Sequence, residues 1–149
     1  MASRITLDPP TDPARYLYAH HVRVRFAETD AMGIVHHAAY LPYLEEGRVE
    51  YLRAVGHPYQ QLQSDGLDIA VLEAALRYLR PLRFDDEVTV HVMVGPATRT
   101  TFEVGYLLTV AGVAAATAVT VHGCVDHNGR PARLPGWLRE LGSLPVSPQ

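Results

Sequence analysis

The sequence predicts an α+β domain in which a five-stranded antiparallel sheet wraps around one long helix. Apolar and polar residues alternate along several segments, including residues 87–94 and 100–110, as in half-buried strands. Only residues 39–56 repeat apolar side chains at helical spacing over a long stretch. Short turns separate the last three strands, which favours an antiparallel meander. One helix and one sheet bury their apolar faces against each other, so the expected order is β-α-β-β-β-β.

The first strand is expected at residues 21–27, where Val22, Val24 and Phe26 alternate with two arginines. The long helix follows a loop. Pro42 lacks an N–H group and is tolerated only in a first turn, so the helix must begin near Ala39 or Tyr40. Its buried stripe and its stop are predicted at Tyr40, Leu44, Gly47, Tyr51, Val55 and Gly56.

The rest of the chain continues the sheet. Residues 57–67 are interpreted as a linker, because Pro58 and Gly66 interrupt the pattern. Residues 68–80 form an apolar extended segment that we expect to be an edge strand. The remaining strands are predicted at residues 87–94, 100–110 and 113–125, with turns at 111–112 and 126–129 and a short helix at 135–141.

The domain boundaries follow from these elements. Residues 1–18 contain three prolines and no periodic pattern, so they are predicted to form a loose N-terminal arm. The folded domain is predicted at residues 19–142, and residues 143–149 are interpreted as a tail. A chain of 149 residues is long enough for one domain with a substantial core.

Composition excludes several kinds of chemistry. The net charge of −3 does not suggest a general nucleic-acid binder. All 13 basic residues are arginines, so no lysine can form a Schiff base. A single cysteine, Cys124, excludes an internal disulfide and a cysteine zinc cluster. The sequence shows neither the apolar core of a signal peptide nor a membrane-spanning run, and we expect a cytoplasmic protein.

The loop before the long helix carries the strongest indication of catalysis. It places Asp30, Gly33, His36 and His37 just ahead of a helix N-terminus. The N–H groups of about residues 37–39 are expected to be free, and such donors can hold an oxyanion. The carboxylate of Asp30 can act as a general base or as a nucleophile. The loop therefore predicts a hydrolytic site.

Simpler interpretations compete with this one. An isolated aspartate is more often a turn residue or a helix cap, although Asp30 lies well before the helix start. Glu45 is either a second catalytic residue or a surface glutamate that stabilises the helix dipole. Tyr40 is as consistent with core packing as with a pocket wall. The pair His36 and His37 lacks the additional ligands of a zinc site, so no metal is expected.

Several segments together resemble a known family. The loop Thr29-Asp30-Ala31-Met32-Gly33-Ile34-Val35-His36-His37 is followed by Tyr40, Glu45 and Arg48. Glu73 through Tyr78 to Pro81, Arg99 through Val104, and Val125-Asp126 to Gly129-Arg130-Pro131 come in the same order as in that family. Over about residues 22–141 the chain resembles the hot-dog-fold acyl-CoA thioesterases of the 4-hydroxybenzoyl-CoA thioesterase type.

The resemblance implies roles for individual residues. It implies that Asp30 is the catalytic carboxylate and that His37 lies at the helix start, where the family has His or Tyr. Two roles are open for His37: its side chain polarises the thioester, or its backbone N–H holds the oxyanion. Glu45 is kept as a candidate third catalytic residue. Arg99 lies where the family often has a basic residue for the nucleotide of coenzyme A. The expected substrate-binding residues are Gly33, Tyr40, Arg99 and Thr101.

The resemblance also implies partners. It predicts hydrolysis of acyl-CoA thioesters without a cofactor, in a side-by-side homodimer or a homotetramer, with no nucleic acid or membrane partner. Pairing of two copies along the 68–80 edge would place the sites at the subunit boundary. An acyl-carrier-protein thioesterase, a hot-dog dehydratase or hydratase, and a non-catalytic acyl-CoA-binding protein remain as alternatives.

Overall fold

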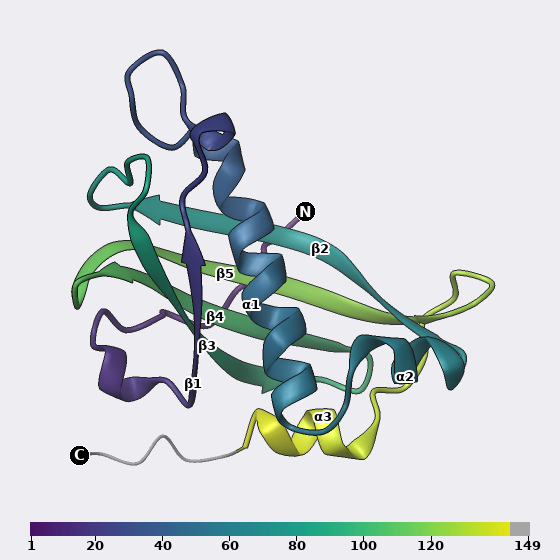
Figure 1. Cartoon of the computed structure of the whole chain (residues 1–149). Helices are drawn as coiled ribbons and strands as arrows, with labels where there is room; N and C mark the ends of the chain where they lie inside the picture. Colours follow the sequence, from purple (N-terminus) through teal and green to yellow (C-terminus); the bar gives the residue numbers. More distant parts are fainter. Residues whose placement is uncertain (144–149) are drawn as a thin grey trace.

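The computed structural model describes residues 1–143 and contains one five-stranded antiparallel sheet crossed by a long helix (Figure 1). The order of the strands in the sheet is β1-β3-β4-β5-β2. The predicted α+β architecture is therefore confirmed. The strands are β1 (Tyr18–Arg23), β2 (Leu67–Tyr78), β3 (Glu87–Ala97), β4 (Thr101–Val110) and β5 (Val113–Asp126), and the helices are α1 (Tyr40–Ala54), α2 (Tyr59–Ser64) and α3 (Gly136–Leu141).

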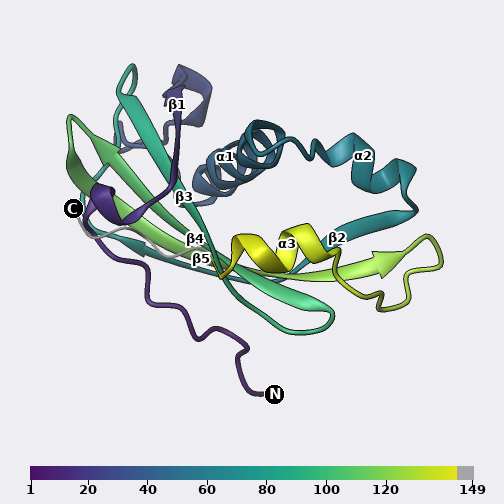
Figure 2. The ribbon, with the colours of Figure 1, turned by 90° about the horizontal axis from the view of Figure 1, so that it is seen from below.

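Helix α1 packs on one face of the sheet, and the N-terminal arm lies on the other (Figure 2). The alternating valines of β3 supply much of the core, and Val88, Val90 and Val92 are fully buried. Gly47 allows α1 to approach β3 closely, because a Cβ atom there would lie 2.7 Å from Val90 Cγ1. A β-strand presents alternate residues to each face, so the even-numbered residues of β3 and β4 face α1.

The meander of β3, β4 and β5 follows the sequence prediction closely. Ala111 and Gly112 connect β4 to β5, and both have positive φ, at 50° and 79°. This conformation suits a two-residue hairpin, since its backbone twist matches that of the strands. The register pairs Tyr106 with Ala118 and Val104 with Thr120, which brings side chains from two strands together beneath α1.

Two predicted elements need correction. The first strand is Tyr18–Arg23 rather than residues 21–27. Val24 is 1% exposed, but its backbone bonds to Asp85 and Asp86 instead of continuing the strand. Its burial explains why the alternation extends past the end of the strand. The predicted linker contains helix α2, which the pattern did not indicate because Leu62 is its only buried residue.

The N-terminal arm does not lie free of the sheet. The carboxylate of Glu103, which is 4% exposed, accepts hydrogen bonds from Thr6 N, Thr6 Oγ1 and Leu7 N at 2.6, 2.5 and 3.0 Å. The side chain of Leu7 covers Gly95 and Gly105, where there is no Cβ atom in its way. The arm contains a 3-10 turn at Pro13–Arg15, and the contacts of Thr6 and Leu7 hold it on the sheet. The tail predicted at 143–149 lies outside the described residues except for Ser143.

The two edges of the sheet differ. The edge strand β1 has six residues, whereas β2 has twelve and leaves Val71 and Tyr78 about half exposed. The prediction that the segment after the linker forms an edge strand is confirmed. Within residues 1–143, no helix has the length and apolar character needed to cross a membrane.

Candidate active site

A cavity of about 440 Å³ lies between the loop before α1 and the end of β2. We call it the loop cavity. Asp30, His37 and Tyr40 reach it from the loop and the helix start, and Tyr78 and Arg80 reach it from the other side. Two of the predicted catalytic residues, Asp30 and His37, therefore line one cavity, and their catalytic roles stay predictions.

Backbone hydrogen bonds within the loop hold Asp30 in place. Its N–H donates to Ile34 O at 2.8 Å, and its carbonyl accepts from Gly33 N at 2.9 Å. Its Oδ1 atom accepts from Met32 N at 2.8 Å, so the carboxylate is also a turn residue, as the simpler interpretation held. Among residues 1–143, no hydrogen bond uses Oδ2. One oxygen therefore fixes the side chain, and the other remains able to accept a proton or attack a carbonyl.

Gly33 has a structural role in this turn. Its φ of +78° lies in the left-handed region, where glycine carries no steric penalty. No heavy atom lies within 4 Å of the position that a Cβ would take. The glycine is therefore explained by its backbone conformation, which lets the turn close behind Asp30. Its predicted contact with substrate stays a prediction.

Only one of the three N–H groups predicted to be free has no hydrogen bond among the described residues. A short 3-10 turn, His37–Ala39, precedes α1 and uses the other two. Ala38 N donates to His36 Nδ1 at 3.1 Å, and Ala39 N donates to His36 O at 2.8 Å. Within residues 1–143, no hydrogen bond uses the N–H of His37. His36 therefore caps the turn, and its neighbour supplies the remaining donor beside the loop cavity.

Glu28 joins the beginning of the loop to α1. Its carboxylate accepts hydrogen bonds from Tyr43 Oη at 2.7 Å and from Arg25 N at 2.7 Å, and Arg25 also forms an ion pair with it. Burial alone would raise the pKa of the Glu28 carboxyl, but these hydrogen bonds and the arginine lower it overall. This anchor was not predicted, although the spacing of Arg25 and Glu28 matches a capping box.

Tyr78 joins the helix start to β2. Its hydroxyl donates to His37 O at 3.0 Å, and its ring packs edge-on against Tyr40 with 4.9 Å between centroids. Tyr40 is 3% exposed, and burial raises the pKa of its hydroxyl. Packing and a pocket wall are therefore both correct descriptions of Tyr40. No separate role was predicted for Tyr78, because its contact spans 41 positions of the chain.

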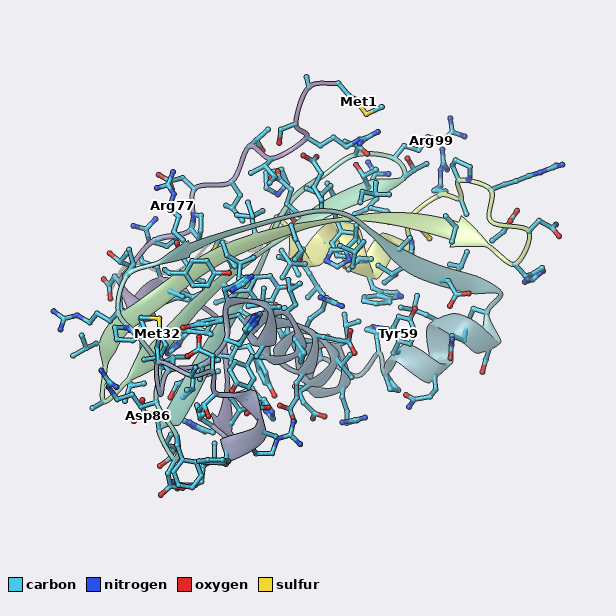
Figure 3. All side chains as sticks on the ribbon, turned by 90° about the horizontal axis from the view of Figure 1, so that it is seen from above. Met1, Met32, Tyr59, Arg77, Asp86 and Arg99 are labelled. Atoms are coloured by element: carbon cyan, nitrogen blue, oxygen red, sulfur yellow. The ribbon has the colours of Figure 1, made fainter. Side chains whose placement is uncertain are left out.

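The other predicted residues lie elsewhere in the protomer. Glu45 lines a second cavity between α1 and the sheet and does not border the loop cavity. Arg99 is exposed in the turn between β3 and β4, at the opposite end of the molecule from Met32 and the Asp30 loop (Figure 3). The hydroxyl of Thr101 interacts with that of Thr98 at 2.7 Å inside the same turn. One protomer therefore does not assemble the full predicted site.

Metal-ligating side chains do not gather in the part of the chain that the structure describes. Among residues 1–143, no three His, Cys, Asp or Glu side chains are placed to hold one metal ion. His36 and His37 stack on each other, with 4.1 Å between ring centroids. His36 Nδ1 is already used by Ala38 N. The loop therefore offers a carboxylate, an N–H donor and the imidazole of His37 as its chemical groups.

Comparison with known proteins identifies the family of the chain. A family model described as the thioesterase-like superfamily matches residues 24–141. The chain belongs to this superfamily. A 1,4-dihydroxy-2-naphthoyl-CoA hydrolase from Thermosynechococcus vestitus is 33% identical over 123 residues, which cover 78% of this chain and 84% of the relative. The expected hot-dog thioesterase relationship is therefore confirmed.

Solved structures of similar proteins share the fold. A hypothetical protein from Aquifex aeolicus has a TM-score of 0.79 at 38% identity, covering 84% of this chain and 98% of that one. A thioesterase from Thermus thermophilus, complexed with coenzyme A and Zn, has a TM-score of 0.74 at 30% identity, covering 87% and 99%. Together with the family match, these neighbours identify the protein as a thioester hydrolase.

Proposed function

We propose that the protein hydrolyses acyl-CoA thioesters in the loop cavity, with Asp30 as the reacting carboxylate and the His37 N–H as an oxyanion donor. One observation carries this proposal. Among the described residues, a carboxylate with an oxygen that forms no hydrogen bond and a residue with an unused backbone N–H line the same cavity. Thioester hydrolysis needs both groups, because a base or nucleophile must act while negative charge develops on the carbonyl oxygen.

Two routes use this arrangement. As a general base, Asp30 takes a proton from water while the water oxygen attacks the carbonyl carbon. The C–S bond then breaks, and the departing sulfur carries the electron pair and gains a proton. As a nucleophile, Asp30 forms a mixed anhydride and releases the thiolate, and water then cleaves the anhydride. The turn hydrogen bond to Oδ1 orients Oδ2 for either route.

We further propose that two protomers pair along β2. This edge strand has backbone groups that pair on one side only, and Val71, Leu72, Tyr78 and Leu79 are 43–53% exposed along it and just beyond its end. An exposed, apolar edge of this length tends to be covered. A two-fold axis perpendicular to the sheet would join two copies into a continuous antiparallel sheet with both α1 helices on the same face.

This dimer completes the predicted site. In an antiparallel pair, the Tyr78 end of one β2 lies beside the Leu67 end of the other. The second cavity, with Glu45, borders Ile69 and Val71 near the Leu67 end. Arg99 lies at the same end of the sheet, because Leu67 pairs with Asp126 and Thr101 with Gly123. Pairing therefore brings the partner's copies of these residues toward the Asp30 loop.

Release of free thiol from a panel of acyl-CoA thioesters tests the proposed reaction. Wild-type protein should release coenzyme A from at least one substrate, and Asp30→Asn should release far less. Asp65→Asn is a control, because Asp65 is an exposed turn aspartate that lines neither cavity. Sedimentation of the same samples reports the dimer. A folded wild-type protein that releases no thiol from any substrate would contradict the proposed function.

A further inference from the structure

The second cavity, which we call the helix cavity, has a volume of about 310 Å³ and lies between α1 and the sheet. It shares no lining residue with the loop cavity. Its volume is at the small end of the roughly 300–1,000 Å³ typical of ligand pockets. Most of its wall is apolar, but Arg48 and Glu45 also line it. Two opposite charges in an otherwise apolar cavity call for an explanation.

Arg48 is half-buried, and its guanidinium has few hydrogen-bond partners. Its Nη1 atom donates to Tyr106 Oη at 3.3 Å. No carboxylate in residues 1–143 lies within 4.0 Å of its guanidinium. A guanidinium carries five N–H donors and no acceptor. Most of its hydrogen-bonding capacity is therefore available to an acceptor that enters the helix cavity.

A buried chain of hydrogen bonds holds Arg48 at the cavity wall. Tyr106 Oη lies 2.7 Å from Thr120 Oγ1, which lies 2.7 Å from His122 Nε2. We call these four residues the polar chain. Because Arg48 can only donate, every hydroxyl finds an acceptor when the chain runs from Arg48 to Tyr106, Thr120 and His122. His122 is then a neutral acceptor, and burial together with Arg48 lowers its pKa to about 3.

The cavity offers one charged donor and one charged acceptor. Glu45 is exposed and Arg48 is half-buried, and both line the cavity. A hydroxyl group suits this pair, because it can accept from the guanidinium and donate to the carboxylate. A carboxylate ligand would face repulsion from Glu45. A plain hydrocarbon would cover Arg48 and leave its donors unsatisfied, which is unfavourable.

The apolar wall favours an aliphatic ligand over an aromatic one. Two aromatic residues of the cavity already stack on other rings. Phe102 stacks on His122 with 5.0 Å between centroids, and Tyr51 stacks on Tyr18 with 5.3 Å. The remaining wall is largely built from branched aliphatic side chains such as Ile69, Val71, Val94 and Val104.

We propose that the helix cavity of one protomer receives the acyl chain of the thioester held at the partner's Asp30, and that Arg48 and Glu45 select an aliphatic acyl group with a hydroxyl at its far end. This inference rests on the proposed thioesterase function and on pairing along β2. It assigns the substrate class, which the loop cavity alone does not. It also gives Glu45 a role in specificity.

Matched substrates test the proposal. Hexanoyl-, octanoyl- and decanoyl-CoA are each compared with the omega-hydroxy derivative of the same length, and thiol release gives kcat/KM. For at least one length, wild-type protein should prefer the hydroxylated substrate by roughly tenfold or more, the range for a hydrogen bond to a charged group. Arg48→Met should remove most of that preference while the plain substrate is still cleaved.

Control variants separate specificity from stability. Arg53→Met removes an exposed arginine from the same helix and should keep the preference. Tyr106→Phe removes the hydrogen bond from Arg48 to Tyr106 but keeps the guanidinium charge in the protein, so it should keep more of the preference than Arg48→Met. Equal loss in Tyr106→Phe and Arg48→Met would assign Arg48 a purely structural role and overturn the proposal. If Arg48→Met does not fold, Glu45→Gln should still reduce the preference.

The outcomes also distinguish this proposal from the proposed function. Equal cleavage of every matched pair by wild-type protein would overturn the selection of hydroxylated chains and leave the hydrolase function intact. No thiol from any substrate would overturn the function instead. Calorimetry with the methyl esters of omega-hydroxyoctanoic and octanoic acids then decides the cavity's preference directly, since binding needs no hydrolysis and neither ester carries a carboxylate that could pair with Arg48. Tighter binding of the hydroxy ester by wild-type protein, lost in Arg48→Met, supports the cavity assignment, and equal binding overturns it.

Discussion

The Asp30 loop and the polar chain both lie beside α1, but they are built in opposite ways. The loop consists largely of partly or fully exposed residues, and most of its backbone hydrogen bonds are short-range, although Val35 N also donates to Leu82 O at 2.8 Å. In the polar chain, side chains from α1, β4 and β5 bond to one another, and Tyr106 and His122 are completely buried. The loop therefore depends mainly on local sequence, whereas the polar chain depends on the register of the sheet.

This difference predicts how each region responds to mutation. A loop side chain can change its charge without leaving a hole in the core, so activity should fall while the fold persists. A buried polar chain is costly when one member is removed, because its neighbours lose their partners away from water. Substitutions in the loop should therefore lower activity with little loss of stability, whereas substitutions in the polar chain should mainly lower stability.

The largest expected effect belongs to Asp30→Asn. The substitution keeps the size of the side chain and the acceptor for Met32 N but removes the negative charge. As a general base, Asp30 should contribute roughly 10²–10⁴ in rate, and a nucleophile could contribute more. We expect the loss in kcat, with KM and the thermal midpoint nearly unchanged. A variant that keeps more than about a tenth of wild-type kcat would contradict a base role of that size.

Isotope labelling distinguishes the general-base route from the nucleophilic route at Asp30. In a single turnover in ¹⁸O water, the anhydride route places label in the Asp30 carboxyl, because water attacks after the carboxylate has bonded to the acyl group. Direct attack by water places label only in the product acid. Mass spectrometry of the peptide that contains Asp30 reads the result.

The next largest effect should come from pH acting on His122. Its pKa of about 3 in the folded protein lies below the unfolded value near 6.5, and burial followed by the Arg48 charge causes the difference. The unfolded chain therefore binds one more proton between these values, and stability falls as the pH falls. The slope is about 1.4 kcal/mol per pH unit between roughly pH 6 and 4.

Urea unfolding at fixed protein concentration over this pH range measures the slope. His91, whose pKa is lowered by burial and by His21, contributes in the same direction, so a variant is needed to isolate His122. His122→Gln keeps a polar side chain of similar size but does not titrate, and its curve should be flatter by about the slope of one group. Parallel curves for variant and wild type would show that His122 is not a buried neutral group.

Much of the fold was predictable because its signals are local. The period-two alternation of β3 and β4 and the position of Pro42 in α1 all appear where the sequence indicated. Helix α2 was missed because Pro58 and Gly66 flank a short segment with one buried residue. The end of β1 was misplaced because Val24 is buried without being part of the strand.

In the candidate site, too, only the features with local signals were predictable. Asp30, Gly33 and His37 could be selected because they are close in sequence and share one loop. The spacing did not reveal that His36 would use two of the three N–H groups of the turn. The sequence does not indicate the polar chain, because its members come from three elements that only the folded sheet brings together.

Two tyrosine substitutions, one in each region, test the same comparison and have smaller expected effects. Tyr106→Phe removes a buried hydroxyl that contacts Arg48 and Thr120, and should lower the free energy of unfolding by about 1–3 kcal/mol. Tyr43→Phe removes the hydroxyl bonded to Glu28, which keeps its bonds from Arg25. It should cost about 0.5–1.5 kcal/mol and lower kcat by loosening the loop.

Thermal unfolding and thiol release, measured on both variants, test this division. Tyr106→Phe should be the less stable variant, and Tyr43→Phe should have the lower kcat at a temperature where both remain folded. If Tyr106→Phe lowers kcat more than Tyr43→Phe, the polar chain takes part in catalysis and the proposed separation of the two regions is wrong.

The smallest expected effect concerns Arg99, which belongs to neither region. It is exposed at the end of the sheet away from the Asp30 loop of its own protomer (Figure 3). If pairing along β2 brings the partner's Arg99 toward that loop, Arg99→Ala should raise KM for acyl-CoA roughly two- to fivefold, the range for one exposed ion pair with a phosphate. The value of kcat should stay nearly constant, because phosphate binding is equal in the ground and transition states.

Salt dependence and a second arginine decide whether Arg99 acts through its charge. Salt should reduce the difference in KM between Arg99→Ala and wild type, since the Debye length falls to about 3 Å at 1 M. Arg139→Ala provides an exposed arginine outside both cavities as a control, and it should leave KM unchanged. If Arg99→Ala also leaves KM unchanged at low salt, the nucleotide binds elsewhere, and Arg80 beside the loop cavity is the next residue to replace.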